Sequence, residues 1–258
     1  MEFGLLDWSV LLLGAAAAGW VDAVIGGGGL VLIPLILAVA PQLAPATALA
    51  TNKLAAVFGT ASAAFTMVRQ VRPSRRVLAA YLPVALGCAG SGALAASLIQ
   101  ASVMRPVIIV LLLAVGSFVA LRPGFGAGPE VAVPSGWRRW AALAGVAVIG
   151  FYDGVFGPGT GMFLIMAFTG LLSQNFLTSA AMAKVVNTAT NLGALLVFAL
   201  GGHVLWLLGL SLAVANVLGA QMGAKTVLGG GITFIRGALI TTVVIMSGYL
   251  LYQQFSGL

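Results

Sequence analysis

Long apolar stretches alternate with short polar or glycine-rich gaps along the whole chain. Most of the stretches contain about 20 residues or more, which at 1.5 Å per residue suffices to cross a hydrocarbon core of roughly 30 Å. We therefore predict an all-α membrane protein with about ten transmembrane segments. These segments lie near residues 5–25, 30–40, 46–68, 76–99 and 104–121 in the first half, and 137–156, 162–172, 177–200, 204–228 and 233–252 in the second.

The second segment of each half is shorter and follows a glycine-rich break. The breaks are residues 26–29 and 157–161, and each is followed by about 11 apolar residues, or roughly 16 Å of helix. Backbone groups that glycine or proline frees from helical bonding cannot face lipid, because no water is present there to satisfy them. Each half should therefore contain a glycine-broken short helix that is buried in protein or lines a polar cavity.

Charged positions of the first half recur in the second. Asp22 and Lys53 recur 131 residues later as Asp153 and Lys184, and a glycine break follows each aspartate. Duplicated units of this kind are typical of membrane transporters that place their site between the two copies. We predict that the repeats form one integral membrane domain and comprise residues 1–128 and 129–258.

The basic residues between the apolar segments predict the orientation of the repeats. With five passes per half, nearly all of them fall on the cytoplasmic side and only Arg105 lies outside. Four passes per half would export Lys225 and Arg236 as well. We therefore predict two inverted repeats of five segments. The residues that this arrangement places in the cytoplasm are Arg69, Arg72, Arg75, Arg76, Arg122, Arg138, Arg139, Lys225 and Arg236.

The composition changes this picture little. With 61% hydrophobic and 7% charged residues, the chain is too apolar for a soluble domain, which carries roughly 25% charged residues. We expect it in the cell inner membrane. The net charge of +7 does not indicate nucleic-acid binding, because the basic residues lie in short gaps between apolar runs. Cys88 and His203 are the only cysteine and histidine, so we expect no disulfide, metal site or cofactor.

Lys53 and Lys184 lie inside apolar segments, where an ionised lysine costs about 2.5–3.5 kcal/mol on insertion scales. Their presence at equivalent positions indicates a function, and we expect them to attract an anionic substrate. Two alternative roles are open. Each lysine extends to the membrane surface, or it neutralises an aspartate in a structural pair.

Polar side chains accompany both lysines. Asn187, Thr188 and Asn191 follow Lys184 at i+3, i+4 and i+7. They share one helical face with it, and that face should meet a cavity or a partner helix instead of lipid. Hydrogen bonding between helices without a ligand is the alternative. We expect the substrate to contact this face and also the two residues before the other lysine, Thr51 and Asn52.

Asp22 and Asp153 precede the glycine breaks by four residues. We expect them to pair with the lysines. Proton uptake during transport and capping of the broken helices are the other roles open to them. The sequence does not decide whether Asp22 meets Lys53 or Lys184.

The glycine breaks offer backbone N–H groups at the start of a short helix, whose dipole favours an anion. They lack the strand and the spacing of a nucleotide-binding loop. Close helix packing is the other use of glycine here. We expect substrate contacts from Gly27, Gly28, Gly29, Gly159, Thr160 and Gly161.

Residues 19–34 (GWVDAVIGGGGLVLIP) and 48–53 (ALATNK) resemble the TauE/SafE family of membrane transporters. Residues 150–161 and 180–184 resemble the same pattern in the second half, so the resemblance extends from end to end. It implies movement of small sulfur-containing anions such as sulfite, sulfoacetate or other organosulfonates. Both exporters and uptake permeases are grouped in the family, so the resemblance does not imply a direction.

The second copy departs from the first at three positions. Pro158 and Thr160 interrupt its glycine run, and Ile165 stands where the first copy has Pro34. These departures leave the choice of sulfur anion open.

We expect a secondary transporter that moves sulfite or an organosulfonate across the inner membrane by alternating access. An anion channel and a non-transporting membrane scaffold subunit are the alternatives. We do not expect an enzyme, because the chain lacks a Gly-x-Ser-x-Gly turn, a His-Glu-x-x-His pair and closely spaced aspartates. The expected partners are the small anion and the lipid bilayer, without nucleic acid. Coupling to protons or sodium and homo-oligomerisation are left open.

Overall fold

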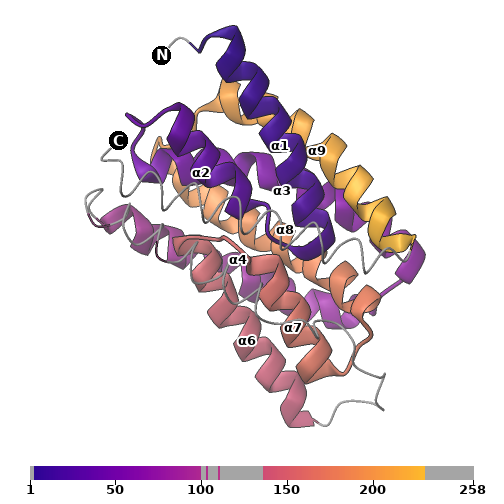
Figure 1. The fold of residues 1–258 in the computed structure, drawn as a ribbon. Coiled ribbons are helices and arrows are strands. Elements are labelled where there is room, and N and C mark those ends of the chain that lie inside the picture. The colour runs from indigo at the N-terminus through magenta and orange to yellow at the C-terminus, as the bar shows by residue number, and fades with distance from the viewer. Residues whose placement is uncertain (1–2, 100–102, 104–109, 111–135, 230–258) are drawn as a thin grey trace.

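The computed structural model describes residues 3–99, 103, 110 and 136–229, and every regular element among these residues is a helix (Figure 1). This confirms the all-α prediction for the described part of the chain. The predicted segments 104–121 and 233–252 lie outside the described residues, apart from residue 110. The helices are α1 (Leu5–Ile25), α2 (Gly29–Val39), α3 (Pro45–Val71), α4 (Arg75–Leu98), α6 (Gly136–Val155), α7 (Thr160–Leu172), α8 (Phe176–Leu200) and α9 (Trp206–Leu228).

Several of these helices can span a membrane. Within the described residues, α1, α3, α4, α8 and α9 are long and apolar enough to do so. The helices α2 and α7 have only 11 and 13 residues, as the glycine breaks predict. The helix α6 has 20 residues and begins with a polar turn that contains Arg138 and Arg139. The count of ten spans includes segments beyond the described residues.

The helix boundaries follow from the local sequence. The helix α1 ends at Ile25 and is capped by Gly26, whose φ of +80° lies in the left-handed region that glycine adopts without strain. Gly157 and Gly159 have φ of +91° and +80° just before α7. The helix α3 begins at Pro45, which lacks an N–H that the first turn would leave unpaired. Asn175 caps α8 by accepting a backbone N–H at 2.8 Å.

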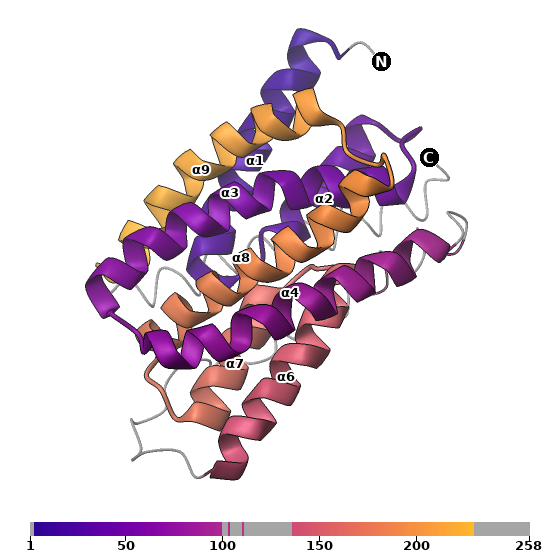
Figure 2. The same cartoon turned by 180° about the vertical axis from the view of Figure 1, so that it is seen from behind.

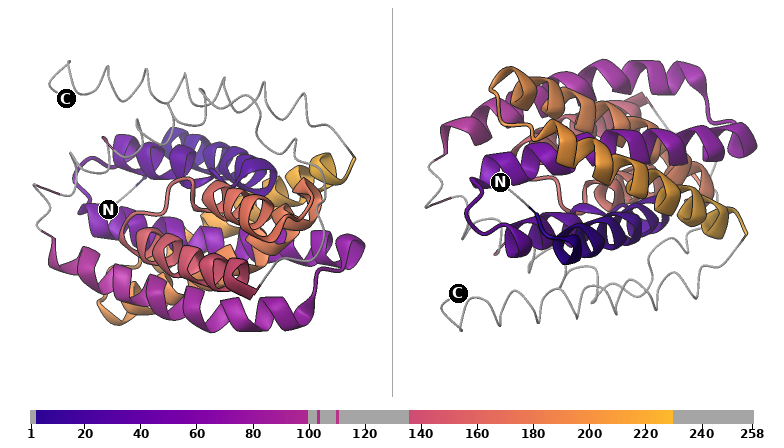
Figure 3. Two further views of the ribbon diagram at one scale, coloured as in Figure 1. Left: turned by 90° about the horizontal axis from the view of Figure 1, so that it is seen from below. Right: turned by 90° about the horizontal axis from the view of Figure 1, so that it is seen from above.

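The sequence repeat is also visible in the structure. Every described helix of the second half begins 131 residues after a helix of the first, with α6 following α1, α7 following α2, α8 following α3 and α9 following α4. Each half also packs against the other. The helix α1 of the first half packs along α9 of the second, and α6 of the second half packs along α4 of the first. The helices α3 and α8 contact each other and run in opposite directions (Figure 2). The two halves therefore interlock, with α1 and α4 on opposite sides of the bundle (Figure 3).

Glycines at equivalent positions allow the helices of the α4–α6 and α1–α9 pairs to approach each other closely. A Cβ atom at Gly92 in α4 would lie 2.1 Å from the carbonyl oxygen of Phe151 in α6. A Cβ atom at Gly223 in α9 would lie 2.6 Å from the carbonyl oxygen of Trp20 in α1. Small residues at such crossings let the helix backbones touch, which is how helices associate inside a membrane.

Candidate functional site

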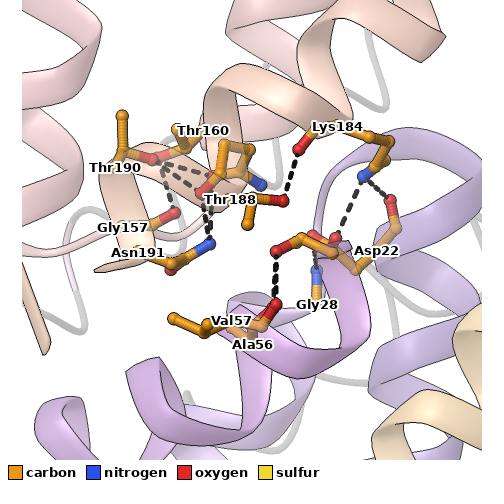
Figure 4. Close-up of polar contacts among 12 residues, drawn as sticks. Asp22, Gly28, Ala56, Val57, Gly157, Thr160, Lys184, Thr188, Thr190 and Asn191 are labelled. Carbon is orange, nitrogen blue, oxygen red and sulfur yellow. Dashed lines mark hydrogen bonds and ion pairs between the residues drawn. The ribbon is translucent and has the colours of Figure 1, made fainter. Parts of the chain in front are cut away.

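Two buried ion pairs join the two halves of the protein. Lys53 Nζ in α3 lies 2.8 Å from Asp153 Oδ2 in α6, and Lys184 Nζ in α8 lies 3.0 Å from Asp22 Oδ2 in α1. The ammonium group of Lys184 also donates to the main-chain oxygen of Asp22 (Figure 4). Each lysine thus pairs with the aspartate of the other repeat. The sequence could not decide between the two pairings.

Both lysines are sealed inside the protein. Lys53 is 1% exposed and Lys184 is 0% exposed. The alternative that each lysine extends to the membrane surface is therefore wrong, because an amine that reached the head groups would not be covered by protein. Removing an ion from water costs several kcal/mol, and only a close, hydrogen-bonded partner offsets that cost.

The aspartates also accept hydrogen bonds from residues at the start of the short helices. At the first break, Gly28 donates its backbone N–H to Asp22 Oδ1 at 3.3 Å. At the second, the Thr160 hydroxyl donates to Asp153 Oδ1 at 2.7 Å. A carboxylate four residues before a break lies close enough to interact with the positive N-terminal end of the helix that follows the break. The N–H of Gly28, which we expected to face a substrate, is therefore occupied by the protein itself.

The glycine breaks contact each other at the centre of the protein. A Cβ atom at Gly161 would lie 2.5 Å from the Cα of Gly26. A Cβ atom at Gly157 would lie 2.6 Å from Lys53 Nζ and 2.9 Å from Asp153 Oδ1. At Gly157, glycine is required both for its left-handed backbone, with φ of +91°, and for the space it leaves beside the ion pair.

The polar face of α8 is mostly satisfied within its own helix. The Thr188 hydroxyl donates to the carbonyl of Lys184 at 2.8 Å, and the Asn191 amide donates to the carbonyl of Asn187 at 2.8 Å (Figure 4). Asn187 and Asn191 are 3% and 4% exposed, so the face points into protein as the spacing predicts. Thr190, which the spacing does not single out, is also buried and donates to the carbonyl of Asn187 at 3.0 Å.

The matching face of α3 leaves polar groups with unused capacity. The Thr51 hydroxyl donates to the carbonyl of Thr47 at 2.8 Å. Asn52 is 5% exposed, and its side chain forms no hydrogen bond with another described residue. Within the described part of the chain, Lys53 Nζ has no hydrogen-bond acceptor apart from its ion-pair partner. An ammonium group carries three N–H donors, so this amine can bind further oxygen atoms.

Asn216 is a buried polar residue that the sequence analysis missed. It is 4% exposed in α9 and donates its amide to the carbonyl of Ala15 in α1 at 3.0 Å. A Cβ atom at Gly59 in α3 would lie 1.8 Å from Asn216 Oδ1. The signal was a lone asparagine in an apolar helix, and its contacts indicate that it holds three helices together. No group of three or more His, Cys, Asp or Glu side chains lies together among the described residues, so they offer no cluster that could hold a metal ion.

Comparison with known proteins gives a match over nearly the whole chain. The family described as sulfite exporter TauE/SafE matches residues 11–250. The probable membrane transporter protein YfcA of Escherichia coli strain K12 is 38% identical over 250 residues, which cover 95% of this chain and 90% of that protein. A probable membrane transporter protein of Haemophilus influenzae is 34% identical over 258 residues, or 98% of each chain. No solved structure matches the chain significantly.

The family and its relatives are named as transporters and not as enzymes, in agreement with the expectation from sequence. The several apolar helices long enough to span a membrane agree with the expected inner-membrane location. The chain belongs to the TauE/SafE family and is a membrane transporter.

Proposed function

We propose that this transporter moves a small sulfur-containing anion, sulfite or an organosulfonate, across the inner membrane by alternating access. Its transport site lies between two inverted repeats of five spans, residues 1–128 and 129–258. The observation that supports this most is that two fully buried lysines, one in each repeat, each pair with the aspartate of the other repeat. The antiparallel course of α3 and α8, which bear these lysines, agrees with inverted repeats.

The charges of the site suggest how an anion would enter it. Lys53 and Lys184 carry two positive charges, and Asp22 and Asp153 carry two negative charges, so the intact cluster is neutral. An anion therefore binds an ammonium group only if the carboxylate leaves or takes up a proton. Entry of the anion together with a proton avoids burying a net charge, which is costly inside a membrane. We infer that Lys184 binds the anion and that Asp22 accepts the coupled proton.

The two ion pairs differ in exposure, which suggests the order of events. The Asp22 side chain is 15% exposed, whereas that of Asp153 is 2% exposed. Asp22 is therefore the most accessible member of the two pairs in this conformation, and we infer that a solute reaches the Lys184–Asp22 pair from the Asp22 side. Inverted repeats exchange their conformations during transport. The Lys53–Asp153 pair would then be the accessible one in the state that faces the other side.

Neighbouring polar groups complete the proposed anion site. The unused donors of Lys53 and Asn52 support binding of an oxyanion, whose several oxygen atoms accept many hydrogen bonds. The choice of a sulfur anion rests on the family description. The remaining contacts that we propose are Thr51, Asn187, Thr188, Asn191, Gly27, Gly29, Gly159, Thr160 and Gly161.

Uptake of labelled sulfite into proteoliposomes that contain only the purified protein tests the proposal. A carrier gives saturable uptake, a channel gives flux that rises linearly with concentration, and a scaffold subunit gives none. Lys184→Ala should abolish uptake. Lys225→Ala, which removes an exposed lysine from the last turn of α9, is the matched control and should transport normally. Unchanged uptake by Lys184→Ala would remove Lys184 from the site.

A further inference from the structure

A second pocket lies at the end of the bundle where α4, α6 and α8 begin and α7 ends (lower left in Figure 2). Its volume is about 670 Å³. Neither Lys53 nor Lys184 lines it, so it is distinct from the proposed transport site. Arg76 and Arg139 line this pocket, from the first turns of α4 and α6 respectively.

The two arginines lack a carboxylate partner in the described part of the chain. Both are exposed, and neither forms a hydrogen bond or an ion pair with another described residue. The carboxylates among these residues are engaged elsewhere. Asp22 and Asp153 pair with lysines, and Asp7 accepts the backbone N–H of Gly4 at the opposite end of the bundle. The pocket therefore carries positive charge that no described carboxylate neutralises.

Another arginine at this end of the bundle, by contrast, has a hydrogen-bond partner. Arg138 donates to the carbonyl of Gly170 at 2.9 Å, where α7 ends. Arg138 thus binds a carbonyl group in the last turn of α7, whereas Arg139 lines the pocket.

Apolar and aromatic side chains form much of the rest of the pocket lining. Tyr81, Leu143 and Met182 line it, and Tyr81 is 3% exposed and stacks on Phe168 with ring centroids 5.6 Å apart. A pocket lined by both cationic and apolar side chains fits an amphiphile better than a fully hydrated small anion.

Exposed tryptophans place the pocket at the level of the lipid head groups. Trp137 and Trp140, near the start of α6, are 67% and 73% exposed. Indole rings gather where the hydrocarbon meets the head groups, and the loop arginines predict that this end is cytoplasmic. Basic pockets between membrane helices on this side bind anionic head groups.

We propose that the pocket binds the phosphate of an anionic phospholipid from the cytoplasmic leaflet. The guanidinium groups of Arg76 and Arg139 hold the phosphate oxygens, since arginine matches phosphate with paired hydrogen bonds. The glycerol and the upper acyl chain lie against Tyr81, Leu143 and Met182.

Thermal unfolding of the purified protein in neutral detergent tests this proposal. Added cardiolipin or phosphatidylglycerol should raise the midpoint in a saturable manner, and phosphatidylcholine should not. In Arg76→Gln/Arg139→Gln, the half-saturating concentration of the anionic lipid should rise about 30-fold, given the energy typical of two basic residues at an anionic surface. Arg72→Gln/Arg75→Gln removes the same charge from exposed residues outside the pocket and should keep the wild-type response.

Three results would overturn the proposal. Equal loss of the lipid response in both double variants would show that the response depends on general surface charge and not on this pocket. No stabilisation of the wild type by anionic lipid would remove the site. Equal stabilisation by free glycerol phosphate would assign the pocket to small anions. Native mass spectrometry of the same variants counts the bound lipids directly, so the outcome does not depend on unfolding alone.

Discussion

Replacing Lys53 tests whether the ion pairs cross between the repeats. Lys53→Met keeps the apolar stem and leaves Asp153 charged, 2% exposed and without its ammonium partner. Breaking one partner of a buried pair costs about 3–5 kcal/mol, a large part of the roughly 5–15 kcal/mol by which folded proteins are stable. The Thr160 hydroxyl still donates to Asp153 but carries no charge, so we expect the full penalty.

A second substitution, at an aspartate, distinguishes pairing between the repeats from pairing within each repeat. Adding Asp153→Asn removes the stranded charge, and replacing a whole buried pair by neutral residues is often without net cost. The double variant should therefore regain most of the lost stability. Asp22→Asn makes the same chemical change at the equivalent aspartate and should not rescue Lys53→Met, because Asp22 pairs with Lys184.

The assay is thermal unfolding of the purified variants. A chain of this size shifts by roughly 2–4 °C per kcal/mol, so Lys53→Met should lower the midpoint by roughly 6–20 °C. The coupling energy between Lys53 and Asp153 follows from the double-mutant cycle. Rescue by Asp22→Asn in place of Asp153→Asn would show that the pairs form within each repeat and would refute the structure of this site.

Substitutions at three further positions test the breaks and the helix contacts. Gly157→Ala forces a side chain into a left-handed backbone, which costs about 1–2 kcal/mol before the contact with the ion pair is counted, and it should lower the midpoint in a thermal scan. Thr160→Val loses a hydrogen bond to the Asp153 carboxylate and should cost about 1.5–3 kcal/mol in denaturant unfolding, whereas Thr160→Ser should stay near wild type. Gly223→Leu should sharply reduce the yield of monodisperse protein in size-exclusion chromatography, because its side chain meets the Trp20 carbonyl; normal yield would contradict the α1–α9 contact.

Much of the fold could be predicted from the sequence because membrane helices leave a strong signal. Apolar runs and glycine breaks located all eight helices of the described residues to within a few positions. The 131-residue offset between charged residues also relates the helix starts. These features are local or periodic, so they depend little on the tertiary arrangement.

The pairing of the charges could not be predicted, because it depends on which repeat each helix packs against. Lys53 and Lys184 occupy equivalent positions, and either aspartate could have met either lysine. The contact between Gly28 and Asp22 was missed for a different reason. The sequence suggests that the glycine break offers free N–H donors to a ligand, but the carboxylate six residues earlier already binds the N–H of Gly28.

Buried polar residues outside the repeated pattern were also missed. Thr190 lies at i+6 from Lys184, off the face that the i+3, i+4 and i+7 spacing defines, yet neighbouring helices bury it. Asn216 has no counterpart at the repeat offset, since position 85 is an alanine. A single polar residue in an apolar helix indicates an interhelical contact, but the sequence does not say with which helix.

We propose that Asp22 competes with the transported anion for Lys184, and the affinity of Asp22→Asn for sulfite is the sharpest test of this competition. Without the carboxylate, the ammonium group loses the competitor of the anion, whose attraction is worth about 4 kcal/mol at 4 Å in a partly shielded site. Isothermal titration of purified Asp22→Asn should show sulfite binding at least about tenfold tighter than wild type. Lys184→Met/Asp22→Asn, which is neutral and keeps the packing, should show none. Equal sulfite affinity in wild type and Asp22→Asn, or sulfite binding by the neutral double variant, would contradict the account.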